Sequence, residues 1–145
     1  MDNFKTYSVN REDRGRILLS IKSILHEQEE ILFAYIFGSF IDKEMPFFRD
    51  IDIGIYVDEK EVSFKDTINY TIALSLKIER EIKKYPVDIV ILNNAPLSLA
   101  FRATQGEVLF IRNEDLWTDF VTKIWSMYHD HAITSRQVLQ DIIKE

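Results

Sequence analysis

Two aspartates, Asp50 and Asp52, open a stretch that otherwise has the pattern of a half-buried β-strand, with apolar residues alternating at positions 51, 53, 55 and 57. Residues two apart on a strand point to the same face, with α-carbons about 6.5–7 Å apart, so the two carboxylates converge. Facing carboxylates repel unless a cation lies between them, and Mg²⁺ takes oxygen ligands of this kind. Gly54 lies just beyond on the same face, where we expect its missing side chain to leave room for a ligand.

A third acid, Asp88, lies inside another apolar run, predicted to be a strand over residues 87–92. If the two strands are neighbours, the three acids can hold two metal ions about 3.5–4 Å apart, the arrangement that stabilises the attacking and leaving oxygens of an in-line phosphoryl displacement. Two plainer interpretations stay open. Asp50 and Asp52 could cap local backbone amides, and Asp88 could lie at a solvated strand end.

A Gly-Ser pair, Gly38 and Ser39, follows the apolar run 31–37, and ten residues separate it from Asp50. Glycine lets a backbone approach a phosphate group closely, the amides that follow can point at it, and the serine hydroxyl can donate a further hydrogen bond. The pair therefore predicts a phosphate-binding turn near the acids.

The elements that must position these residues follow from hydrophobic periodicity and end signals. Asn10 and Asp13 could cap a first helix that runs to Leu25, and Ser63 and Asp66 have the spacing of a capping box for a second. A short helix is expected between residues 96 and 106, and a C-terminal helix includes residues 117–128. Strands are expected over 31–37, 51–57, 87–92 and 108–111. We therefore expect an α/β fold: a mixed β-sheet of about four strands flanked by helices, with a long C-terminal helical region.

Length and composition favour one domain over residues 1–145, since 46% of the residues are hydrophobic. The net charge of −6 disfavours a nucleic-acid partner, which would need a broad positive surface. The chain has no cysteine for disulfides or thiolate metal sites. No apolar run approaches the roughly 18 residues of a membrane span, and the first 13 residues are polar. We expect a cytoplasmic protein without membrane contact.

Taken together, these residues form the pattern Gly-Ser-x10-Asp-x-Asp, with Asp88 in the place of a third acid. With this motif the chain resembles the minimal nucleotidyltransferases of the DNA polymerase β-like superfamily, over roughly residues 31–111. The resemblance implies the nucleotidyltransferase fold and nucleotidyl transfer from a nucleoside triphosphate, with pyrophosphate leaving. It further implies that Asp50, Asp52 and Asp88 are catalytic and bind two Mg²⁺ ions, that Asp88 helps to position or activate the incoming hydroxyl, and that Gly38 and Ser39 hold the β- and γ-phosphates.

The same resemblance suggests a partner. Small members of the family commonly serve as antitoxins beside a HEPN-domain toxin and transfer AMP from ATP to a tyrosine of that toxin. The resemblance therefore implies a protein adenylyltransferase with ATP as its substrate. Two alternatives are a binding-only antitoxin that masks its toxin and a nucleotidyltransferase that acts on a small-molecule or RNA hydroxyl. The acidic triad disfavours the first, and the absence of a basic stripe disfavours RNA.

The loop after the Gly-Ser pair departs from the family pattern. Residues 40–43 are Phe-Ile-Asp-Lys where family members usually have Phe-Ala-Lys/Arg-Gly, and Arg49 stands where a serine usually precedes the first aspartate. We assign Lys43 as a candidate nucleotide-binding residue that supplies positive charge from a shifted position. Arg49 is an alternative, and both also fit solvated loop residues.

Two further groups of residues have more than one interpretation. Arg102, Gln105 and Arg112 flank the predicted short helix, where a basic residue could reach a phosphate or base, although a surface ion pair also explains them. Near the C-terminus, four apolar residues could close the core or form a patch for a partner: Val138, Leu139, Ile142 and Ile143.

Overall fold

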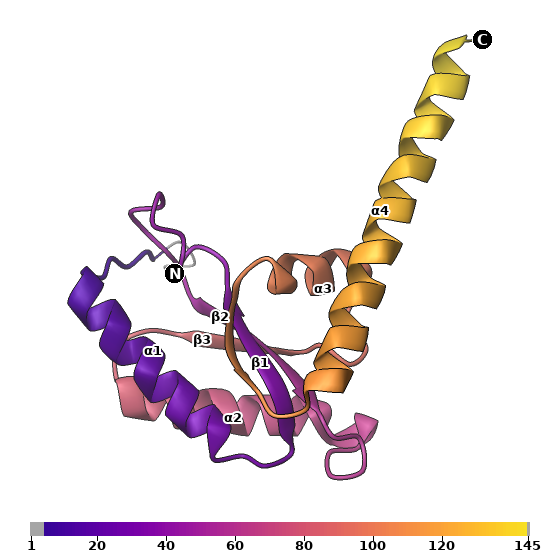
Figure 1. The fold of residues 1–145 in the computed structure, drawn as a ribbon. Helices are drawn as coiled ribbons and strands as arrows, with labels where there is room; N and C mark the ends of the chain where they lie inside the picture. The colour runs from indigo at the N-terminus through magenta and orange to yellow at the C-terminus, as the bar shows by residue number, and fades with distance from the viewer. Residues whose placement is uncertain (1–4, 145) are drawn as a thin grey trace.

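The computed structural model describes residues 5–144 (Figure 1). Its elements in chain order are α1 (Arg11–His26), β1 (Ile31–Phe37), β2 (Ile51–Val57), η1 (Phe64–Asp66), α2 (Thr67–Ile82), β3 (Val87–Ile91), α3 (Leu97–Thr104), β4 (Glu107–Ile111) and α4 (Glu114–Lys144). The α/β class and the four expected strands are confirmed, with strand boundaries that differ by at most one residue from those expected.

Of the two predicted helix caps, one is confirmed and one is wrong. Asn10 caps α1 as predicted, because its side-chain oxygen accepts a hydrogen bond from the Asp13 amide at 2.8 Å. The capping box at Ser63 does not form. The Ser63 hydroxyl instead donates to the Asp66 carboxylate at 2.8 Å, and the short 3₁₀ turn η1 precedes α2.

The sheet has the strand order β3-β2-β1-β4. β1 pairs antiparallel with both β2 and β4, whereas β2 and β3 run parallel, so the sheet is mixed, as expected. The parallel register places Asp52 directly opposite Asp88. This pairing brings together two acids that lie far apart in the sequence.

The two faces of the sheet bury different sets of residues. Odd-numbered β2 residues such as Ile53 and Ile55 are fully buried in a cluster that includes Leu25 of α1 and Ile78 of α2. On the opposite face, a second cluster of aromatic and aliphatic side chains from the sheet packs against the first half of α4: Phe33, Tyr35, Phe37, Leu92, Leu116, Trp117 and Phe120. Helices α1 and α2 therefore cover one face, and α3 and α4 lie over the other (Figure 1).

The first turns of helix α4 attach it to the sheet. The indole nitrogen of Trp117 donates a hydrogen bond to the Tyr35 hydroxyl at 2.7 Å. The C-terminal half of the helix projects beyond the body of the molecule (Figure 1). Its apolar residues Leu139 and Ile142 are 59% and 63% exposed, so neither closes the core. The side chains of Val138 and Ile143 lie outside the described residues. None of the helices in the described part of the chain combines the length and hydropathy needed to span a membrane.

Candidate active site

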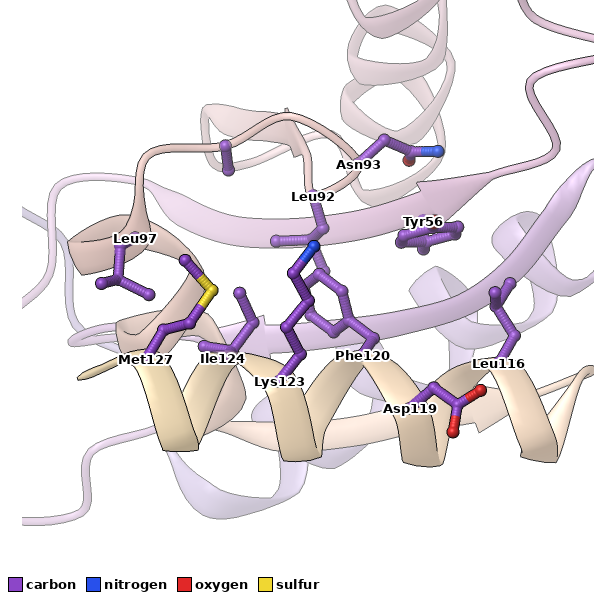
Figure 2. A pocket seen from close by; sticks show the side chains of 11 residues that line it. Tyr56, Leu92, Asn93, Leu97, Leu116, Asp119, Phe120, Lys123, Ile124 and Met127 are labelled. Atoms are coloured by element: carbon purple, nitrogen blue, oxygen red, sulfur yellow. The ribbon is translucent and has the colours of Figure 1, made fainter. Parts of the chain in front are cut away.

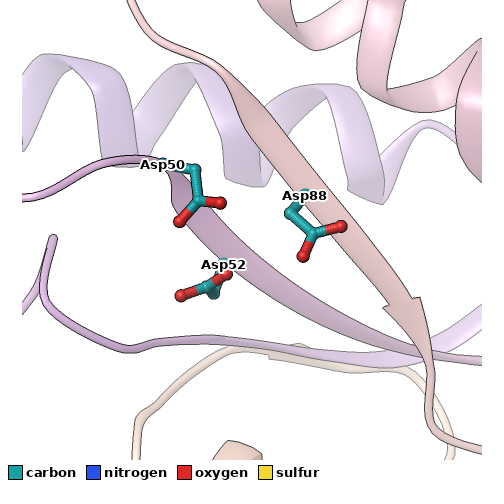
Figure 3. Close-up of side chains that lie close together, drawn as sticks. All are labelled: Asp50, Asp52 and Asp88. Atoms are coloured by element: carbon teal, nitrogen blue, oxygen red, sulfur yellow. The ribbon is translucent and has the colours of Figure 1, made fainter. Parts of the chain in front are cut away.

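Three aspartates converge at one end of the sheet. Asp50 directly precedes β2, Asp52 is the second residue of that strand, and Asp88 is the second residue of β3. One carboxylate oxygen from each side chain lies within 4.8 Å of the other two. Figure 3 shows the three carboxylates turned toward one another across the two strands. The structure thus brings together all three predicted acids.

Strand pairing and core burial explain this convergence. Ile51 and Val87 are register partners, and the amide of Ile51 donates to the Pro86 carbonyl at 2.9 Å, which fixes the entry of both strands. Because Ile51 is fully buried on the α1/α2 face, the alternation of the strand turns Asp52 to the α3/α4 face. The same alternation along β3 turns Asp88, the residue after Val87, to the α3/α4 face as well.

The electrostatics of the cluster favour a bound cation. Burial raises the pKa of Asp52 to about 6, with further increases from the charges of Asp50 and Asp88 and a partly offsetting decrease from Arg102. Burial likewise raises the pKa of Asp50, and the charge of Asp88 adds to this, whereas Arg49 lowers it. All donors are carboxylate oxygens, the ligands that Mg²⁺ prefers, and a divalent ion between them would remove the repulsion. The residues present therefore fit a divalent metal.

The Gly38 turn lies against the acids. Gly38 adopts φ +83°, a conformation that favours glycine, and a β-carbon at this position would collide with the Asp52 carboxylate. The positive φ favours glycine here, and any side chain would also require the Asp52 carboxylate to move. Ser39 follows as a half-buried residue of the same turn. The predicted phosphate-binding turn and the predicted metal site are thus adjacent.

A hollow of about 500 Å³ opens beside this turn. It is lined by residues of the turn, the loop that follows and the end of α3: Phe37, Gly38, Ser39, Ile41, Asp42, Met45, Arg102, Gln105 and Gly106. Lys43 is exposed in the loop and is not among the lining residues.

Arg102 and Arg112, the two arginines near α3, make contacts other than the surface ion pairs that we considered. Arg102 lies over the Phe37 ring, with its guanidinium carbon 5.6 Å from the ring centroid. Arg112 donates to the backbone carbonyls of His26 and Ile31 at 2.6 and 3.2 Å, so it ties the end of β4 to the turn before β1. The sequence had no periodic signal that separates these two roles.

The expectation for Gly54 was wrong. Leu92, which follows β3, lies over this glycine, and a β-carbon there would meet the leucine side chain at about 3.0 Å. Leu92 therefore fills the space that we expected a ligand to use. Beyond it, a pocket of about 320 Å³ lies between the sheet and α4, with Tyr56 and Phe120 in its wall (Figure 2).

A family model described as Polymerase beta, Nucleotidyltransferase matches residues 20–115, from within α1 to the first turn of α4. The chain belongs to this family. The match confirms the resemblance inferred from the Gly-Ser and Asp-x-Asp motif, and it spans every strand of the sheet and all three aspartates. Among curated proteins, none matches the chain significantly.

Solved structures of toxin–antitoxin complexes share the fold. A chain from the complex of tri-AMPylated Shewanella oneidensis HEPN toxin with MNT antitoxin is 23% identical, with a TM-score of 0.61, covering 91% of this chain and 99% of that one. A chain of the MntA–HepT complex is 22% identical, with a TM-score of 0.57 and coverages of 94% and 100%. A toxin–antitoxin complex with AMP-PNP contains a chain that is 24% identical, with a TM-score of 0.59 and coverages of 88% and 98%.

Proposed function

We propose that the protein is an antitoxin that transfers AMP from ATP to a tyrosine hydroxyl of a partner HEPN toxin. The observation that carries this proposal is the convergence of Asp50, Asp52 and Asp88 within 4.8 Å, beside the Gly38 turn, in a member of the Polymerase beta nucleotidyltransferase family. Support for the acceptor comes from the similar fold found in the complex with a tri-AMPylated HEPN toxin.

Each part of the site has a role in this reaction. Asp50, Asp52 and Asp88 hold two Mg²⁺ ions, which neutralise charge on the triphosphate and on the attacking oxygen when bound. The Gly38 turn and the Ser39 hydroxyl hold the β- and γ-phosphates. The acceptor oxygen bonds to the α-phosphorus as the bond to the β-phosphate oxygen breaks, so pyrophosphate leaves.

Asp88 is the acid best placed to meet the acceptor, because it is exposed whereas Asp50 and Asp52 are half-buried. We propose that it orients the incoming hydroxyl and accepts its proton. Lys43 stays a candidate for the triphosphate, since its exposed position in the loop leaves its side chain free to approach a ligand from solvent.

Two alternatives predict different chemistry. A binding-only antitoxin needs no acidic cluster. The raised pKa values of Asp50 and Asp52 indicate that ionisation of the cluster destabilises the folded chain, and a catalytic role explains why such a cluster is present. Transfer to RNA is disfavoured by the net charge of −6. We place the reaction in the cytoplasm, as expected from the sequence.

The direct test is the intact mass of the toxin. We expect a HEPN toxin encoded beside this protein to gain the mass of one or more AMP groups when the two are incubated with Mg²⁺ and ATP. Peptide mapping should place the added mass on tyrosine. Asp50→Asn is the control, because it removes one charge from the cluster with little change in volume. An unmodified toxin, or equal modification by Asp50→Asn, would refute the proposal.

A further inference from the structure

The wall of the hollow opposite the Gly38 turn carries a cation that the motif does not include. Arg102 lies in the last turn of α3, is exposed, and lines the hollow together with Gly38 and Ser39. Its guanidinium carbon is 5.6 Å from the centroid of the Phe37 ring, so the aromatic side chain supports the charged group beside the turn.

The backbone fixes the place of Arg102 relative to the turn. Gly106 packs so tightly that a β-carbon there would collide with the Ile36 carbonyl oxygen, and its amide donates to the Ala103 carbonyl at 3.0 Å. The next residue, Glu107, is the register partner of Ile36. The end of α3 is therefore attached to the end of β1, from which the Gly38 turn begins.

The charge of Arg102 is available to a ligand. Within residues 5–144, Arg102 forms no ion pair with a carboxylate. Asp42 also lines the hollow, but its carboxylate accepts a hydrogen bond from the Glu44 amide at 2.9 Å within its own loop.

We propose that this hollow is the subsite for the β- and γ-phosphates and that Arg102, supplied by α3, is its cation. A guanidinium presents paired donors that match two phosphate oxygens. In this position it binds the pyrophosphate portion in the ground state and stabilises the charge that develops on it as it leaves. The inference rests on the proposed nucleotidyl transfer and names the residue that holds the leaving group.

The test compares binding of AMP-PNP and of AMP by calorimetry in Mg²⁺. We expect Arg102→Gln to weaken AMP-PNP binding by about 10- to 100-fold, the loss of a charge-assisted contact, with little change for AMP. Arg102→Lys keeps the charge but loses the paired donors, so it should bind with intermediate affinity, and it keeps the test decisive if the glutamine variant fails to fold. Arg80→Gln is the matched control, because Arg80 is an arginine of the last turn of α2, over the opposite face of the sheet.

Unchanged AMP-PNP affinity in Arg102→Gln, or equal losses for AMP-PNP and AMP, would overturn the subsite. Toxin mass measured in parallel separates this inference from the proposed function. Modification of the toxin by Arg102→Gln at the wild-type rate would overturn the subsite and leave the proposed function standing. Binding of AMP-PNP that depends on Arg102, in a protein that leaves the toxin unmodified, would support the subsite and overturn the acceptor.

Discussion

Burial raises the pKa of Asp52 to about 6. It is half-buried, Asp50 and Asp88 lie close on one side, and the Gly38 backbone leaves no space on another. Without a cation its ionised form is disfavoured, so the site is maintained at a cost to the stability of the folded chain. This cost is measurable because it depends on pH.

We expect Asp52→Asn to stabilise the metal-free protein in a pH-dependent way. The folded state binds more protons than the unfolded state between pH 3.8, the usual pKa of an aspartate, and about 6, so the ionisation of Asp52 lowers the free energy of unfolding as pH rises through this window. The variant should match the wild type below the window and exceed it by about 1–2 kcal/mol above it, after allowance for solvent screening of a partly exposed group. Urea denaturation in chelator at several pH values measures the difference. A difference independent of pH would contradict the assigned environment.

Metal and nucleotide should act together on the melting temperature. A ligand that binds only the folded state stabilises it by RT ln(1 + [L]/Kd), about 2.7 kcal/mol when its concentration is 100 times Kd. We expect ATP to raise the melting temperature in Mg²⁺ and to have little effect in chelator, since the three carboxylates otherwise repel the phosphates. Asp52→Asn should lose this response. An equal shift in chelator would argue against a metal-dependent site.

At the scale of elements, the parallel pairing of β2 with β3 assembles the acids, and the contact of Gly106 with β1 assembles the hollow. Both contacts join segments distant in sequence. Neither depends on a flexible loop. The sheet and its backbone contacts therefore position the acids, the Gly38 turn and Arg102.

Gly106→Ala tests the second contact. The added methyl group would press on the Ile36 carbonyl and the Phe37 side chain, so we expect the free energy of unfolding to fall by about 1–3 kcal/mol. Gly15→Ala is the matched control, because Gly15 lies within α1 and the added carbon would meet no atom within 4 Å beyond the local helix backbone and its chain neighbours. We expect this variant to gain about 0.5–1 kcal/mol. Chemical denaturation of both variants provides the measurement. Equal effects at the two positions would show that the α3 end is not packed against β1 as described.

Much of the sequence was informative at this scale because local patterns specify local structure. Alternation located the four strands, and the spacing of Gly38, Ser39 and the aspartates predicted their proximity. The predictions that failed concerned tertiary contacts. Leu92 fills the space over Gly54 from just beyond the neighbouring strand β3, and Arg102 lines the hollow because Gly106 permits a close backbone approach. Neither contact leaves a periodic signal in the sequence. The roles of the site residues, including that of Lys43, stay predictions.

At the scale of the molecule, the sheet separates the main hydrophobic core from the candidate active site. One face is a continuous hydrophobic core beneath α1 and α2, and the other carries the acids, the Gly38 turn and α3. Asp88 is exposed, and the C-terminal half of α4 projects beyond the body of the molecule (Figure 1). The acids are therefore accessible at Asp88 without any rearrangement of the core.

Neutralisation of the toxin is catalytic in this account, and the most direct test is its stoichiometry. Purified HEPN toxin is mixed with a substoichiometric amount of this protein, Mg²⁺ and ATP, and toxin mass and toxic activity are followed together. Asp88→Asn is the control, because a single exposed carboxylate changes to an amide and the rest of the docking surface is kept. We expect the wild type to add AMP to all of the toxin and abolish its activity, and Asp88→Asn to do neither. Protection that requires equimolar protein, persists in Asp88→Asn and adds no mass to the toxin would contradict the claim.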